Sequence, residues 1–211
     1  MSLDPGNRII VALDTVDILG AKNLVRQLKG RVGGVKIGKE LFTAHGPEGV
    51  VAIIEEGVPV FLDLKFHDIP NTVSAAVRAA VRLKPFILDI HASGGRAMME
   101  AARDATNDEA NKIGIKKPKL LAVTVLTSLN SKDLKEIGVG DPPVDQVKRL
   151  ASLAQESGLD GVVCSAAEIR TLRSQCGDKF LILTPGIRPK WADLDDQKRV
   201  VTPSKAVSRG C

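Results

Sequence analysis

Residues 58–84 read VPVFLDLKFHDIPNTVSAAVRAAVRLK, and this stretch contains the repeating unit of the fold. Its first part, Val58 to Leu64, is a short and largely apolar run, which is typical of a strand buried on both faces of a sheet. A polar segment follows, and residues 71–84 then place apolar side chains at helical spacing. The stretch therefore predicts a strand, a loop and a helix that covers the strand.

The same unit recurs on both sides of this stretch. Further apolar runs predict strands at residues 8–13, 34–37, 86–91, 119–126, 161–164 and 180–184. Helical patterns lie between them, at residues 17–30, 47–56, 95–110, 143–157 and 166–175. Gly57 and Gly158 end two helices as left-handed caps, and Ser165 with Glu168 predicts a capping box ahead of the last one. Strands that alternate with helices predict an α/β fold with a parallel sheet, either a barrel or an open, doubly wound sheet.

Polar residues at the strand ends favour the barrel. Side chains suited to chemistry fall at or just past the carboxyl ends of successive strands: Asp14, Lys36, Lys39, Asp63, Lys65, His91, Thr127, Ser165 and Arg188. A barrel gathers all these ends at one mouth, whereas an open sheet spreads them along an edge. No Gly-x-Gly-x-x-Gly motif follows the first strand, so a dinucleotide-binding fold has no support. We therefore predict a single TIM-type (β/α)8 barrel domain over residues 1–211, with seven βα units visible.

Composition excludes several classes of function. The 211 residues fit one domain, although α/β barrels often use about 250. Met1 to Leu3 is interpreted as an expression leader, and the absence of a membrane-length apolar run or a secretion signal predicts a soluble, cytoplasmic protein. The 30 basic residues are interleaved with 25 acidic ones and only 3% are aromatic, which favours a small anionic substrate over nucleic acid. The widely spaced Cys164, Cys176 and Cys211 are interpreted as reduced, structural thiols.

The segment after the third predicted strand carries the chemistry. Asp63 and Lys65 are two residues apart, so both side chains face the barrel mouth while Leu64 packs outward. With Lys36 from the neighbouring strand and Asp68 from the loop, they predict an alternating array of Lys and Asp charges. Such an array perturbs proton affinities and could keep one lysine charged as a proton donor. The alternative is a structural ion-pair cluster that closes the mouth.

Residues 63–73, DLKFHDIPNTV, resemble the signature of the orotidine 5′-phosphate decarboxylase family. Four more segments agree in chain order: Val-Ala-Leu-Asp at 11–14, Val-Lys-Ile-Gly at 35–38, Val-Thr-Val-Leu-Thr-Ser at 123–128, and Thr-Pro-Gly-Ile-Arg-Pro at 184–189 followed by Asp-Gln-Lys-Arg at 196–199. A lone Asp-x-Lys-x-x-Asp also occurs in related phosphate-sugar barrels, but five colinear motifs are specific. The resemblance implies a (β/α)8 barrel, a homodimer with two active sites at the subunit interface, and decarboxylation of orotidine 5′-phosphate to UMP without metal or organic cofactor.

Residue roles follow from the same resemblance. It implies that Lys65 protonates C6 as the carboxylate leaves, that Asp63 sits beside that carboxylate and that Lys36 orders the array. Asp68 would reach into the partner subunit's site. The resemblance implies substrate contacts for Asp14 and Lys36 at the ribose hydroxyls, Thr127 and Ser128 near the pyrimidine and ribose, Arg188 and Gln197 at the phosphate, and also Asp63, Thr72 and Pro185. Residues 188–202 are expected to form a phosphate-gripping lid, and His67 and His91 to support the loop and rim.

The end of the chain departs from the family pattern. A last helix is expected from Thr202-Pro203 to Gly210. The resemblance implies an eighth strand after this helix, ending in a phosphate-binding Gly-Arg pair, and this strand is expected to be missing because the sequence stops at Cys211. A seven-stranded barrel is expected to leave a gap with two unpaired edges and to bind phosphate less tightly. Two alternatives remain open: a metal-dependent sugar-phosphate decarboxylase or aldolase with Asp63 and Asp68 as magnesium ligands, and an inactive nucleotide-binding protein.

Overall fold

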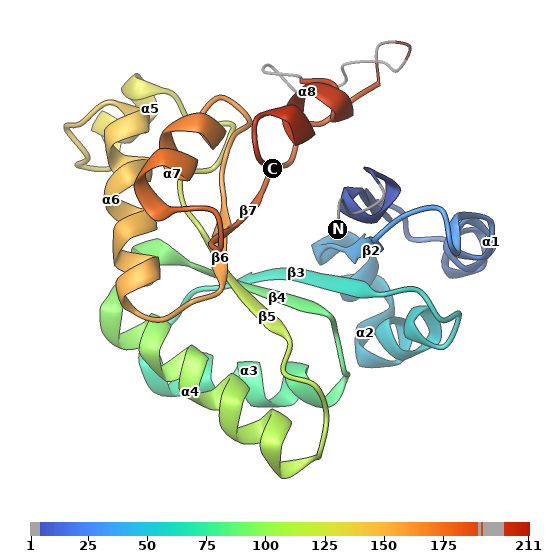
Figure 1. Ribbon diagram of the computed structural model, residues 1–211. Helices are drawn as coiled ribbons and strands as arrows, with labels where there is room; N and C mark the ends of the chain where they lie inside the picture. The colour runs from blue at the N-terminus through green and yellow to red at the C-terminus, as the bar shows by residue number, and fades with distance from the viewer. Residues whose placement is uncertain (1–4, 190, 192–200) are drawn as a thin grey trace.

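The sheet is parallel throughout and curls into an open barrel (Figure 1). The computed structural model describes residues 5–189, 191 and 201–211. Each strand pairs with the next one along the chain, in the order β1 (Ile10–Ala12), β2 (Gly34–Ile37), β3 (Val60–Phe66), β4 (Ile87–His91), β5 (Lys119–Val123), β6 (Gly161–Val163) and β7 (Leu181–Leu183). The seven predicted strands are confirmed, and the sheet is of the TIM-barrel type.

Helices cover the outside of the curled sheet (Figure 1). They are α1 (Ile18–Leu28), α2 (Lys39–Ile54), α3 (Pro70–Arg82), α4 (Arg96–Lys112), α5 (Ser131–Glu136), α6 (Pro143–Glu156), α7 (Ile169–Cys176) and α8 (Pro203–Ser208), with 3₁₀ turns η1 (Pro5–Arg8) and η2 (Ala92–Gly94). The predicted helix from Thr202-Pro203 is α8, with Thr202 as its N-cap. Gly57 and Gly158 adopt φ values of 80° and 77°, as the predicted left-handed caps require.

Two helical segments were missed by the sequence prediction. The first half of α2 precedes a kink at Gly46, where φ is 59°, and Pro47 follows directly; these two residues read as a break in the sequence. The short helix α5 is too brief to show a periodic pattern, and it is held by a capping box in which Asn130 and Asp133 exchange side-chain and main-chain hydrogen bonds.

The start of α7 differs from its prediction. The Glu168 carboxylate accepts the Ser165 N–H at 2.6 Å, as a capping box requires, but the Ser165 hydroxyl accepts from Ala167 N at 3.2 Å instead of from Glu168 N. These bonds close a turn over residues 166–168, and α7 begins only at Ile169. The predicted start at residue 166 was therefore wrong by one turn.

Two apolar layers form the core, one on each face of the sheet. The larger layer lies between the sheet and the helices and includes Leu62, Leu88, Met98 and Met99. The smaller one comprises the buried side chains Phe61, Ile87, Leu121, Val123 and Val163, with Ile10 and Leu183 packed against them. Because side chains alternate along a strand, this second layer faces the barrel interior, and its members Phe61 and Ile87 lie one step below Asp63 and Asp89 on the same strands.

The barrel is open between β1 and β7, since no strand pairing joins them within the described residues. Both ends of the described chain lie near this opening: the Arg8 guanidinium, just before β1, donates to the Cys211 carbonyl at 3.3 Å.

Of the predicted lid, residues 190 and 192–200 lie outside the described residues, as does the predicted leader, Met1 to Leu3. The described part of that segment includes a parallel bridge between Ile187 and Val201. No described helix is both long and apolar enough to cross a membrane.

Candidate active site

Four charged side chains form a continuous array at the carboxyl ends of β1 to β3. Lys36 Nζ lies 3.0 Å from Asp14 Oδ1 and 3.5 Å from Asp63 Oδ2, and Lys65 Nζ contacts the other oxygen, Asp63 Oδ1. The charges therefore alternate in the order Asp14, Lys36, Asp63, Lys65. Side-chain exposure is 10% at Asp63, 22% at Lys36, 25% at Lys65 and 63% at Asp14, so the array is most buried at Asp63 and most exposed to solvent at Asp14.

Strand alternation explains how the sequence places the two inner residues of this array. Val35 and Ile37 are fully buried against the helices, so Lys36 between them faces the barrel interior. Leu64 likewise packs outward, as predicted, and leaves Asp63 on the inner face. Asp63 is 7% exposed and stands directly above the apolar interior layer.

Lys65 reaches Asp63 by an unusual backbone conformation. Its φ is 53°, in the left-handed region that residues other than glycine rarely adopt, and the β3–β4 register shifts between Leu62 and Phe66. Its main-chain N–H donates to Asp89 Oδ1 on β4 at 2.8 Å. Asp89 was not identified by the sequence analysis, and its signal was an acidic residue inside the otherwise apolar run of the fourth strand.

Competing influences set the protonation of the two buried carboxyls. Burial works to raise the pKa of Asp63, but a hydrogen bond from Asp89, a hydrogen bond from Lys65 and the charges of Lys65 and Lys36 outweigh it, so that its pKa lies below the ordinary value. Burial, followed by the neighbouring Asp63 charge, raises the pKa of Asp89 well above the ordinary value. The pair thus favours a charged Asp63 beside a protonated Asp89.

His91 and His67 form a ring pair beside the array. Their centroids are 5.3 Å apart and the planes are inclined by 35°. Burial, then the charges of His67, Lys65 and Lys39, lower the pKa of His91 to about 4, while Asp63 opposes the shift. His91 is therefore neutral at neutral pH and suits a supporting role at the rim.

Asp68 does not join the array of its own chain. It is exposed in the loop after β3, and its Oδ1 accepts the Ile69 N–H at 2.6 Å. Asp63 meanwhile has two ammonium groups as neighbours, so the two carboxylates do not form the magnesium pair of the metal-dependent alternative. Within the described part of the chain, no group of three or more His, Cys, Asp and Glu side chains is arranged to hold a metal ion.

The other expected substrate contacts lie on loops and helix ends that follow the strands. Thr127 is half-buried and Ser128 exposed in a turn after β5, Thr72 is exposed in the first turn of α3, and Pro185 is exposed after β7. Arg188 is half-buried; its main-chain N–H donates to the Val201 carbonyl at 3.1 Å. The expected phosphate ligand Gln197 lies outside the described residues.

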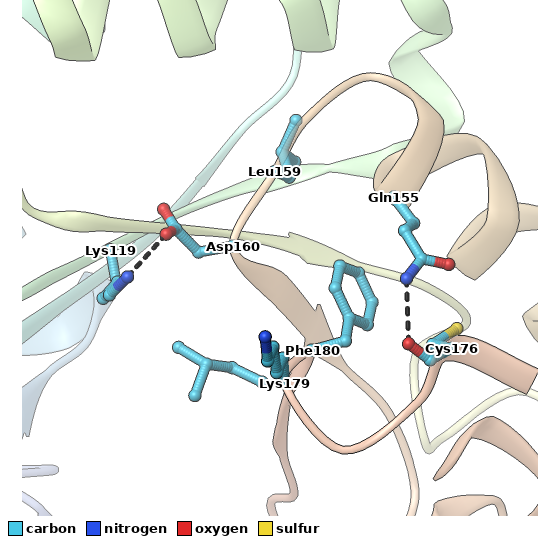
Figure 2. Close-up of a pocket in the computed structure, with 8 residues that line it drawn as sticks. Lys119, Gln155, Leu159, Asp160, Cys176, Lys179 and Phe180 are labelled. Atoms are coloured by element: carbon cyan, nitrogen blue, oxygen red, sulfur yellow. Dashed lines mark hydrogen bonds and ion pairs between the residues drawn. The ribbon is translucent and has the colours of Figure 1, made fainter. Parts of the chain in front are cut away.

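A hollow of about 340 Å³ lies away from the array, at the amino-terminal ends of β5 to β7, and Figure 2 shows its lining side chains. It is lined by Lys119, Gln155, Leu159, Asp160, Cys176, Lys179, Phe180 and Leu181. Lys119 Nζ pairs with Asp160 at 2.7 Å, and Gln155 Nε2 donates to the Cys176 carbonyl at 2.9 Å. Because these polar groups satisfy one another across the hollow, it is a weaker candidate than the charged array.

Known proteins match nearly the whole chain. The model of the orotidine 5′-phosphate decarboxylase / HUMPS family matches residues 7–211. A Rhodospirillum rubrum protein named orotidine 5′-phosphate decarboxylase is 53% identical over 205 residues, which cover 97% of this chain and 83% of that protein. A Paramagnetospirillum magneticum protein of the same name is 52% identical over 97% of this chain and 87% of its own length. The crystal structure of orotidine 5′-phosphate decarboxylase from Lactobacillus acidophilus superposes with a TM-score of 0.83 at 38% identity, covering 96% of this chain and 86% of that one.

Proposed function

The chain belongs to the orotidine 5′-phosphate decarboxylase / HUMPS family, and from this membership we infer that it decarboxylates orotidine 5′-phosphate to UMP in pyrimidine nucleotide synthesis. The observation that carries the inference is the Asp14–Lys36–Asp63–Lys65 array, at the mouth of a barrel about half identical in sequence to decarboxylases over almost its full length. These relatives do not favour the aldolase or the inactive-protein alternative.

In the proposed reaction Lys65 is the proton donor. The bond from C6 to the carboxylate carbon breaks, CO₂ leaves, and the electron pair stays on C6 until it takes a proton from the Lys65 ammonium. The pyrimidine ring cannot spread this charge easily, so fixed positive charge near C6 stabilises the transition state. Lys65 supplies both the charge and the proton, and the resulting amine regains its proton from water.

Asp63 and Lys36 set the conditions for that step. The charged Asp63 carboxylate contacts Lys65 and lies 3.5 Å from Lys36 Nζ, so it keeps both ammonium groups directed at the mouth. Next to the substrate carboxylate, its negative charge would raise the energy of the ground state relative to the transition state. We assign the ribose hydroxyls to Asp14 as acceptor and Lys36 as donor, supported by their ion pair at the exposed end of the array.

The phosphate and the second subunit belong to the same proposal. Arg188 is assigned to the phosphate, with Gln197, and residues 188–202 to a lid whose closure expels water and converts phosphate binding into transition-state stabilisation. The remaining substrate contacts are assigned to Thr72, Thr127, Ser128 and Pro185.

We assign Asp68 to the partner subunit's site in a homodimer, supported by its exposure and by its separation from the array of its own chain. We place the enzyme in the cytoplasm, where its free cysteines suit a reducing environment.

Loss of orotate absorbance on addition of orotidine 5′-phosphate tests the function directly. We expect turnover by the wild-type protein, a loss of at least about 100-fold in kcat for Lys65→Ala, and no change for Lys112→Ala, an exposed lysine in the last turn of α4. Turnover unaffected by Lys65→Ala would refute the assignment. UMP binding without turnover would instead support the inactive nucleotide-binding protein, and turnover abolished by a chelator the metal-dependent alternative.

A further inference from the structure

We propose that Asp89 is a positioning residue of the decarboxylation site, because one oxygen of its carboxyl holds the main chain of Lys65 while the other presents a proton to Asp63. The proposal rests on the proposed function and extends it to a residue of β4 that need not touch the substrate. Asp89 is 1% exposed, and it is one of the few fully buried acidic side chains in the described part of the protein.

The first contact fixes where the Lys65 side chain begins. In a regular parallel ladder a strand N–H is accepted by a carbonyl of its neighbour, but the β3–β4 register is irregular between Leu62 and Phe66. Asp89 Oδ1 takes the place of that carbonyl and accepts the Lys65 N–H at 2.8 Å. Lys65 itself has a φ of 53°, a strained conformation for a lysine that persists only where neighbouring groups hold it.

The second contact concerns the other carboxyl oxygen. Asp89 Oδ2 is buried, and within the described residues no donor is placed to give it a hydrogen bond. In the β3–β4 register Leu62 pairs with Leu88, so the next residues, Asp63 and Asp89, lie beside each other on the inner face of adjacent strands. A proton on Oδ2 satisfies both groups, since the carboxyl then donates and Asp63 accepts. Burial and the Asp63 charge raise the Asp89 pKa, which favours this form.

The surroundings leave Asp89 few other partners. The charged groups that face it are Asp63 and Lys65 from β3, and His91 lies two residues further on its own strand. From β5 its register partner is the buried Leu121. A neutral Asp89 that donates to Asp63 stabilises the Asp63 carboxylate without adding a negative charge, and therefore keeps Asp63 available for both lysines.

Three variants separate positioning from simple structural support. Asp89→Asn keeps an oxygen for the Lys65 N–H and an N–H donor for Asp63, so we expect kcat within about threefold of wild type. Asp89→Ala removes both contacts, and we expect kcat to fall about 100-fold with a much smaller change in KM, because a misplaced proton donor affects the chemical step. Asp89→Val, which refills the space with apolar atoms, makes the same comparison should the Ala variant not fold.

Asp160 provides the matched control at the far end of the barrel. Its carboxylate also accepts a main-chain N–H from a neighbouring strand, that of Leu120 at 3.0 Å, and it is partly buried, with its side chain 13% exposed. We expect Asp160→Ala to lower thermal stability and leave kcat unchanged. Loss of kcat in Asp160→Ala equal to that in Asp89→Ala would assign both effects to stability and overturn the proposal.

The pH profile gives a readout that a structural role would not move. Removing the hydrogen bond from Asp89 raises the pKa of Asp63, so the acid limb of kcat shifts to higher pH in Asp89→Ala and stays in place in Asp89→Asn. Equal kcat in wild type and Asp89→Ala, or equal losses of kcat in the Ala and Asn variants, would overturn the proposal.

If the wild type does not decarboxylate the substrate, the proposed function fails. Carboxyl NMR titration of Asp63 then still tests the role of Asp89, because an unchanged Asp63 pKa in Asp89→Ala refutes that role.

Discussion

Replacing His91 with Gln is expected to flatten the acid side of the stability profile of the protein. The native environment lowers the His91 pKa from 6.5 to about 4, chiefly by burial and then by the charges of His67, Lys65 and Lys39. Between these two pKa values the unfolded chain binds a proton that the native protein does not. The favourable contribution of neutral His91 is therefore complete above about pH 6.5 and is lost as the pH falls towards 4.

The magnitude follows from the proton affinities. Each tenfold change in affinity is worth about 1.4 kcal/mol, so the free energy of unfolding should fall by about 2 kcal/mol between about pH 7.5 and about pH 5 through this ring alone. His91 is only partly buried, and solvent screens part of the effect. We therefore expect about 1 kcal/mol, which urea unfolding at the two pH values resolves.

Comparison of wild type with His91→Gln isolates the ring, because the carboxyls that titrate in the same range are common to both proteins. A second variant tests the cause. His67→Gln removes a charge that lowers the His91 pKa, so it should reduce the acid loss of stability without abolishing it. Parallel pH profiles for wild type and His91→Gln would refute this reasoning.

Two further predictions concern the barrel that carries the site. Met98 is fully buried, so Met98→Ala should cost about 2–5 kcal/mol of unfolding free energy in urea titrations, whereas Leu19→Ala, at a position 71% exposed, should stay within about 0.5 kcal/mol. A Cβ at Gly161 would lie 2.2 Å from the Leu181 carbonyl oxygen, so Gly161→Ala should separate β6 from β7 and lower the melting temperature; Gly140→Ala meets nothing within 4 Å and should leave it unchanged. Equal stabilities within either pair of variants would contradict this packing of the core and of β6 against β7.

Sequence patterns located the strands well but not all of their ends. The predicted strand at 34–37 matches β2, where Val35 and Ile37 are buried on the outer face. The predicted strand at 119–126 runs three residues past β5, which ends at Val123. Val125 and Leu126 continue the apolar run into the loop at the mouth, and no periodicity distinguishes an apolar loop residue from a strand residue.

The site was predictable to the extent that it depends on strand ends. Asp63, Lys65 and Lys36 were expected together because parallel strands bring their carboxyl ends to one mouth, and the structure brings them together. The contribution of Asp89 could not be read in this way. It depends on a local register shift and on the backbone angle of Lys65, which result from the packing of two strands and have no pattern in one sequence.

The energetics of the array bear on whether it serves chemistry or merely closes the barrel. Taking Asp63 and its lysines out of water costs several kcal/mol per ion, and buried ion pairs often contribute less to stability than apolar side chains of similar size. The apolar interior layer, in which Phe61 and Ile87 lie directly below Asp63 and Asp89, shows that this barrel fills its interior with apolar groups where only packing is required. If its role were only to close the barrel, the charged layer above, which is buried at Asp63 and exposed at Asp14, would cost more free energy than apolar side chains in the same place. The array is well suited to a substrate whose leaving carboxylate enters the buried part, near Asp63, while its sugar hydroxyls remain at the exposed part, near Asp14. The proposed reaction requires this division.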